Sequence, residues 1–139
     1  MNLIPWVTFT DPEVAHVGMT LEEAKKHHKD DHIHEHKVAY EKVDRAVCES
    51  EPQGLIEVVV DKKDRILGAH IIGMEAGEVL AEWVLAMKYR IPLSKVGNAI
   101  HVYPTLGRVN RRVADERFME HGLAEWTTKL FARFKPHQG

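Results

Sequence analysis

Two runs of β-branched and apolar residues, separated by only four residues, constrain the fold of this chain more than any other feature. Leu55–Val60 and Arg65–Ile72 flank the charged connector DKKD at residues 61–64. Val and Ile favour extended backbone, because their branched side chains pack well on a pleated surface. The short spacing therefore predicts two antiparallel strands joined by a tight turn.

An amphipathic helix is predicted directly after this hairpin. Apolar residues recur there at helical spacing, at Ala76, Val79, Leu80, Trp83, Val84 and Met87. Such a stripe lies on one face of a helix and favours packing against the sheet. The apolar stretch Val79–Met87 is interrupted by Glu82 and is far shorter than the roughly 20 residues of a membrane span. We therefore expect no membrane partner.

Weaker patterns predict the remaining elements. Thr20 and Glu23 have the spacing of a capping box at the start of a helix. The patterns predict strands over 4–10 and 32–43, and helices over 21–28, 92–96, 108–119 and 123–134. Because the strands are grouped and the helices lie between and after them, we expect an α+β fold with an antiparallel β-sheet and helices packed on one side.

Length, charge and cysteine content exclude several classes of protein. The 139 residues suit a single domain, 1–139, and 19 basic against 21 acidic side chains leave a net charge of −2. Nucleic acid binding needs a clustered excess of cations, so it is not expected. Cys48 is the one cysteine, which excludes an internal disulfide and favours a reducing compartment. With no secretory signal recognised at residues 1–9, these features predict a cytoplasmic protein.

Four short motifs carry a resemblance to a known family. They are Phe9–Gly18 (FTDPEVAHVG), Asp44–Ala46 (DRA), Ile66–Gly73 (ILGAHIIG) and Pro104-Thr105. In this order they resemble the carboxy-terminal dimerisation domain of the flavoprotein pyridine nucleotide-disulfide oxidoreductases, which include dihydrolipoamide dehydrogenase and mercuric reductase. The resemblance implies a homodimer, and a parent chain whose FAD and NAD(P) domains are not part of these residues.

Glycine-rich phosphate-binding turns do not occur in the sequence. Neither GxGxxG nor GxxxxGK followed by Ser or Thr is present, and such turns hold dinucleotide phosphates on backbone N–H groups. We therefore expect this chain alone to bind no FAD and no NAD(P), although the resemblance implies that the parent enzyme uses both.

The loop around Pro104 departs from the family pattern at two positions. In the family this loop reads His-Pro-Thr, a buried Glu follows, and the His serves the partner subunit's flavin and redox disulfide as acid and base. Here Tyr103 precedes Pro104, and Arg108 takes the position of the Glu. Tyrosine holds its proton far more tightly than histidine, so Tyr103 is a poor base at neutral pH but a good hydrogen-bond donor.

The resemblance indicates which residues of this loop take part in the parent's chemistry. Tyr103 and His101 are the candidate catalytic residues, because His101 lies two residues earlier and supplies an imidazole. Tyr103, Pro104 and Thr105 are the residues expected beside the partner's cofactor. With a tyrosine before Pro104, the loop resembles that of the mercuric-reductase-like branch. The final residues, 135–139, lack the cysteine pair of that branch. A disulfide and a metal ion both remain possible electron acceptors.

A histidine cluster offers an alternative function. His27, His28, His32, His34 and His36 lie within ten residues. Alternate residues of a strand share a face, so three of these imidazoles would suit a late transition metal in a stand-alone metal-binding or adaptor domain. The surrounding charged residues favour a solvated segment instead, and we expect no specific metal site here.

Overall fold

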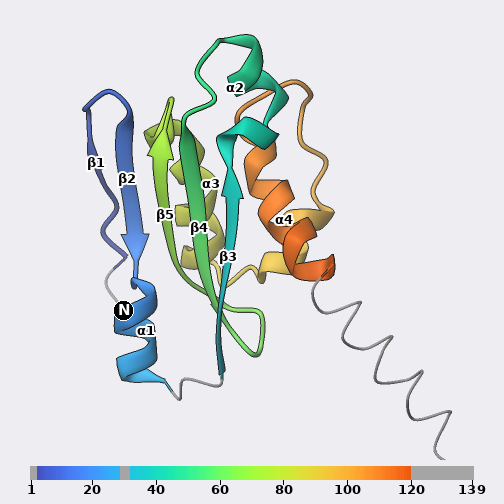
Figure 1. Ribbon diagram of the computed structural model, residues 1–139. Helices are drawn as coiled ribbons and strands as arrows, with labels where there is room; N and C mark the ends of the chain where they lie inside the picture. Colours follow the sequence, from blue (N-terminus) through green and yellow to red (C-terminus); the bar gives the residue numbers. More distant parts are fainter. Residues whose placement is uncertain (1–2, 29–31, 120–139) are drawn as a thin grey trace, which may run out of the picture.

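A five-stranded antiparallel sheet with helices against it forms the fold of this chain, shown here as a computed structural model that describes residues 3–28 and 32–119 (Figure 1). The elements are β1 (Trp6–Thr8), β2 (Glu13–Gly18), α1 (Leu21–His27), β3 (Ile33–Ala39), the 3-10 helix η2 (Tyr40–Lys42), α2 (Asp44–Cys48), β4 (Gly54–Asp61), β5 (Ile66–Gly73), α3 (Ala76–Lys88) and α4 (Leu93–Asn98). A last described helix covers residues 108–119.

The β4–β5 hairpin lies at the centre of the sheet. The strand order is β1-β2-β5-β4-β3, and each neighbouring pair is antiparallel. Asp61 closes the hairpin turn, because its Oδ1 accepts the backbone N–H groups of Lys63 and Arg65, both at 2.9 Å. The Nε–H of Arg65 adds a 2.7 Å bond to Oδ2. The charged connector thus supplies the hydrogen bonds that its own turn needs.

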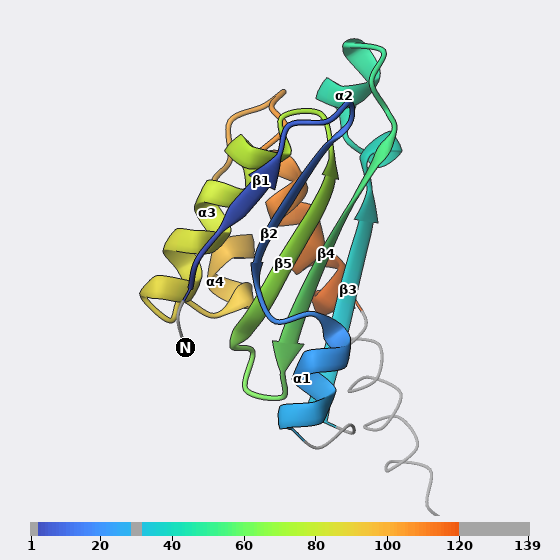
Figure 2. The same ribbon diagram turned by 90° about the vertical axis from the view of Figure 1, so that its left-hand side faces the viewer.

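Helix α3 and the helix of residues 108–119 cover one face of the sheet (Figure 2). Trp83 of α3 is fully buried there, beside Ile56 and Ile71 from the central strands. The opposite face, called here the outer face, is covered by α1 at one end only. The small apolar cluster under α1 consists of Ala24, Ile33, Val59 and Leu67.

The predicted α+β fold with an antiparallel sheet is confirmed, and among the helices of residues 3–28 and 32–119 it is α1 that packs on the outer face. The capping box at Thr20 and Glu23 is present. Strand β2 was not predicted, and the predicted strand 32–43 ends at Ala39, where the 3-10 helix begins. The predicted helix over 123–134 lies outside the described residues. None of the helices in 3–28 and 32–119 is long and apolar enough to span a membrane.

Gly18, at the end of β2, is a position where only glycine fits. Its φ is +85°, and a Cβ there would lie 2.3 Å from the carbonyl oxygen of Leu67. We expect Gly18→Ala to lower the free energy of unfolding by about 2–4 kcal/mol, because backbone strain and a clash add together. Gly107→Ala is the matched control, since its Cβ would meet nothing closer than 3.9 Å. Equal urea midpoints for the two variants would contradict this account.

Candidate functional site

The loop of residues 99–107 turns three of its large apolar side chains outward, while Leu106 is buried in the core. It joins α4 to the helix of residues 108–119. Ile100 is 94% exposed, Val102 74% and Tyr103 60%, whereas the side chain of His101 is only 10% exposed. Water alone would favour the reverse arrangement, so an exposed apolar patch of this kind is typical of an interaction surface.

His101 is held between two hydrogen-bond acceptors. Its Nε2 lies 2.9 Å and 3.1 Å from the two carboxylate oxygens of Glu82, and its Nδ1 lies 3.1 Å from the carbonyl oxygen of Ala99. An imidazole can donate to both partners at once only when each ring nitrogen carries a proton. The ring is therefore fixed between the carbonyl oxygen of Ala99 and the carboxylate of Glu82, and this contact fastens the loop to α3.

Behind this pair, a buried amide connects the loop's anchor to the core. Asn110 is 1% exposed, and its Oδ1 accepts the indole N–H of Trp83 at 2.6 Å. Its Nδ2 donates to Glu82 at 2.8 Å and to the carbonyl oxygen of Val79 at 3.2 Å. Each polar atom of the amide thus has a partner, as a buried amide requires. The carboxylate that holds His101 is itself held in place.

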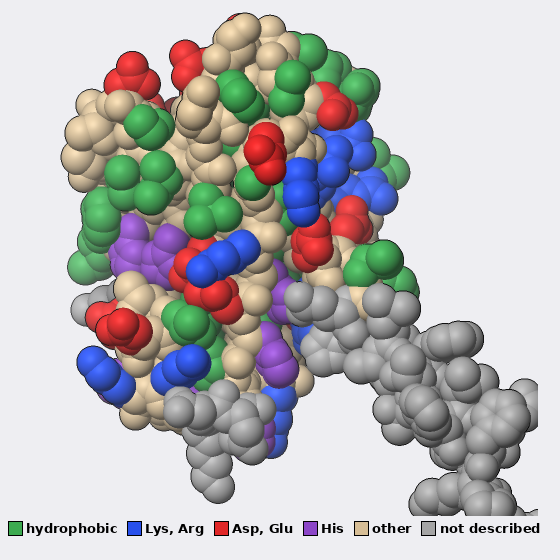
Figure 3. Space-filling model, viewed as in Figure 1, with side chains coloured by type: hydrophobic (Ala, Val, Ile, Leu, Met, Phe, Trp, Pro, Cys, Tyr) green, Lys and Arg blue, Asp and Glu red, His purple; other side chains and the backbone are tan. Residues whose placement is uncertain are grey.

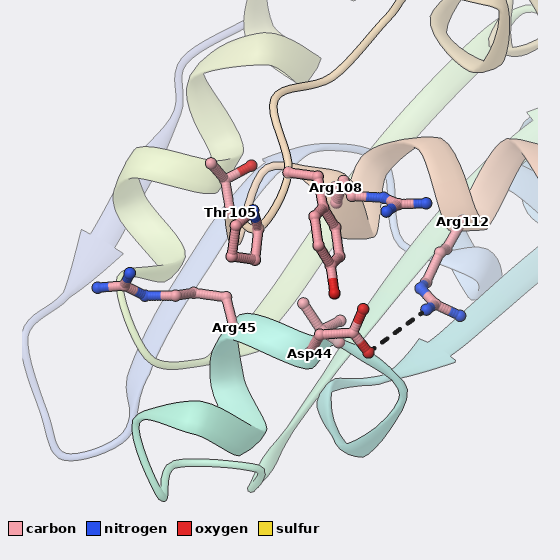
Figure 4. A pocket seen from close by; sticks show the side chains of 8 residues that line it. Asp44, Arg45, Thr105, Arg108 and Arg112 are labelled. Atoms are coloured by element: carbon pink, nitrogen blue, oxygen red, sulfur yellow. Dashed lines mark ion pairs between the residues drawn. The ribbon is translucent and has the colours of Figure 1, made fainter.

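On its other side, the loop lines a shallow depression beside α2. Tyr103, Pro104 and Thr105 contribute to this depression, together with Val43, Asp44, Arg45, Arg108 and Arg112 (Figure 4). The Arg108 guanidinium carbon lies 5.0 Å from the centre of the Tyr103 ring, a cation–π distance. Arg112 pairs with Asp44 at 4.0 Å. Since Arg45 pairs with Glu49 and Arg112 with Asp44, the positive charge of this depression comes from Arg108.

The structure separates the two predicted catalytic residues. Tyr103 lies with Pro104 and Thr105 at the positive depression, whereas His101 points inward to Glu82. Glu82 and Asn110 were missed from the sequence. Glu82 was visible as the charge that interrupts the apolar run of α3, but nothing in the chain pointed to its partner 19 residues away.

The histidine cluster does not form a metal site within residues 3–28 and 32–119. His27 ends α1, whereas His34 and His36 lie in β3, where His36 is buried. Across those described residues, no group of three His, Cys, Asp or Glu side chains is placed to hold a metal ion. The alternative function based on this cluster is therefore not favoured.

Comparison with known proteins places the chain in a family. The model of the "Pyridine nucleotide-disulphide oxidoreductase, dimerisation domain" matches residues 4–113. The chain is 37% identical over 129 residues to the mitochondrial dihydrolipoyl dehydrogenase of Caenorhabditis elegans, covering 92% of this chain and 24% of that protein. It is 40% identical over 106 residues to the dihydrolipoyl dehydrogenase of Trypanosoma brucei brucei, covering 76% and 22%. The chain belongs to the dimerisation-domain family of the pyridine nucleotide-disulphide oxidoreductases.

Solved structures agree on the fold. The Cu(II) complex of the HOCl-induced flavoprotein disulfide reductase RclA from Escherichia coli superposes with a TM-score of 0.77 at 23% identity, over 83% of this chain and 26% of that chain. The chain therefore spans about a quarter of the length of the proteins that it matches.

Asn110 tests whether the buried amide supports the site. We expect Asn110→Ala to lower the free energy of unfolding by about 2–4 kcal/mol, because it leaves the buried Trp83 N–H without an acceptor. Asn98→Ala, at an exposed position, should change it by less than about 0.5 kcal/mol. Denaturant unfolding of both variants gives the comparison, and similar losses in the two would show that the amide network is not a major support.

Proposed function

We propose that this chain is the self-association module of a larger FAD-dependent and NAD(P)-linked oxidoreductase, and that its loop 99–107 contributes to the active site of the partner subunit. The observation that carries the proposal is the outward-facing apolar loop, anchored from below by His101 and Glu82. Membership in the dimerisation-domain family supports the same conclusion.

Within this proposal, the two candidate catalytic residues take different roles. Tyr103 is 60% exposed and offers its hydroxyl as a hydrogen-bond donor toward the partner. His101 serves as a positioning residue, because both of its nitrogens are engaged with Ala99 and Glu82. Pro104 and Thr105 border the partner's cofactor, and Thr105 braces the turn through a 2.7 Å bond from its hydroxyl to the carbonyl oxygen of Val102.

We propose that this chain itself holds neither FAD nor NAD(P). The sequence has no glycine-rich turn for a dinucleotide phosphate, so FAD and NAD(P) would be held by other parts of the parent enzyme. The electron acceptor is proposed only as a class, a disulfide or a metal ion. A phenolic hydroxyl in place of an imidazole suits an acceptor whose reduction needs little proton transfer from this loop.

Self-association is the direct test of the interface. We expect the chain to sediment as a dimer at about 100 μM, well above the micromolar dissociation constants of modest interfaces. Replacing both Ile100 and Val102 by Asp should weaken the dimer strongly, because it puts charge in an apolar contact. Ile4→Asp is the matched control, since Ile4 is 71% exposed but lies at the far edge beside β1. A monomer at every concentration, or equal effects of the two changes, would refute the proposed interface.

The role of Tyr103 needs the full-length enzyme that carries this domain. We expect Tyr103→Phe to lower turnover severalfold while changing the free energy of unfolding by about 1 kcal/mol or less, because an exposed hydroxyl adds little stability. Tyr89→Phe, which removes a hydroxyl at a 70% exposed position, is the control. Unchanged turnover of Tyr103→Phe, together with its loss in His101→Ala, would instead make the imidazole the catalytic group.

A further inference from the structure

A pair of histidines on the outer face of the sheet has no part in the loop or its anchor. His16 of β2 and His70 of β5 are directly opposite each other in register, and their Nδ1 atoms lie 2.7 Å apart. Both residues are half-buried. Figure 3 shows this face, where histidine side chains gather beside hydrophobic ones. At this distance the two nitrogens form a hydrogen bond, in which one Nδ1 donates its proton to the lone pair of the other.

Both rings are fixed by their surroundings. The Nε2 of His70 lies 3.0 Å from the carbonyl oxygen of Met19 and donates its proton there. With the proton of the imidazole on Nε2, the lone pair of His70 Nδ1 points toward His16. The indole of Trp6 stacks on the His16 ring, with centroids 5.1 Å apart and planes 24° apart. A backbone carbonyl that holds the remote N–H is the arrangement that orients metal-binding histidines in general.

We propose that His16 and His70 form a two-histidine binding site for a divalent cation with tetragonal nitrogen coordination, Cu²⁺ before Ni²⁺. Two nitrogens bound at right angles to one ion lie roughly 2.8 Å apart, whereas tetrahedral zinc needs roughly 3.3 Å. The 2.7 Å observed here is the length of the hydrogen bond between the two rings, and it lies close to the tetragonal value, so the two nitrogens need to move little to bind one ion. Cu²⁺ also binds nitrogen ligands most tightly among these ions.

The remaining coordination positions belong to water. No third His, Cys, Asp or Glu completes a metal-binding group around this pair in the described parts of the chain. The cation takes the place of the proton between the two Nδ1 atoms. In a neutral pair that proton moves to Nε2 of His16, and in a singly protonated pair one proton is released to water.

Cu²⁺ titration of the chain tests the site, at about pH 7.5 where an ordinary histidine is neutral. We expect His16→Asn and His70→Asn each to lower the affinity for the first Cu²⁺ ion by about tenfold or more. Even the loss of a residue that only hydrogen-bonds to a metal ligand lowers metal affinity by that much. Electron paramagnetic resonance should count two imidazole nitrogens in the unaltered chain and one in each variant. His28→Asn, which alters the separate histidine cluster, is the control and should leave both readings unchanged.

Three outcomes would overturn the proposal. The first is an unchanged Cu²⁺ affinity and nitrogen count in both variants, which would place the ion elsewhere. The second is Zn²⁺ binding as tight as that of Cu²⁺, which would remove the tetragonal argument. The third outcome is measured on the unaltered chain, so it applies even if the variants fail to fold. As Cu²⁺ is added, we expect paramagnetic broadening of the nuclear magnetic resonance signals to begin at His16, His70 and the Trp6 indole. Broadening that begins in residues 27–36 would contradict the site.

Discussion

The side chain of Asn110 is the contact on which the candidate site depends. One buried amide joins the indole of Trp83, the backbone of α3 and the carboxylate of Glu82. Glu82 in turn holds His101, and His101 holds the loop. A hydrogen bond of this kind contributes most to stability where water cannot replace it. The conformation of the exposed loop is therefore stabilised by hydrogen bonds in the buried core.

This anchoring bears on how the loop would meet a partner. Association costs free energy when a flexible segment must be ordered, and a segment that is already ordered avoids that cost. Here Ile100 and Val102 are exposed, although the residue between them is fixed from below. The arrangement gives an apolar contact surface with little conformational entropy left to lose. A rigid, outward-facing loop is thus consistent with the proposed role in self-association.

The sequence predicted those parts of the structure that depend on local patterns. The central hairpin and α3 follow from side-chain periodicity, and the start of α1 follows from the capping box at Thr20. Strand β2 escaped prediction, because residues 13–18 follow a proline turn and acquire their strand character from pairing with β5. The pairing of His101 with Glu82 escaped it for a related reason. Contacts between distant segments are set by the packing of the whole domain, which no local pattern encodes.

The two residues at which the loop departs from the family pattern contact each other. The family pattern places an imidazole before Pro104 and a carboxylate at position 108, and here Tyr103 and Arg108 occupy those positions, with the guanidinium over the ring. At this exposed position, a guanidinium over a phenol ring is favourable by about 0.5–1 kcal/mol. The imidazole–carboxylate pair has not been lost, because His101 and Glu82 form one beneath the loop. Since both ring nitrogens of His101 face Ala99 and Glu82, the surface that the loop offers a partner consists of the phenol of Tyr103 and the guanidinium of Arg108 rather than an imidazole.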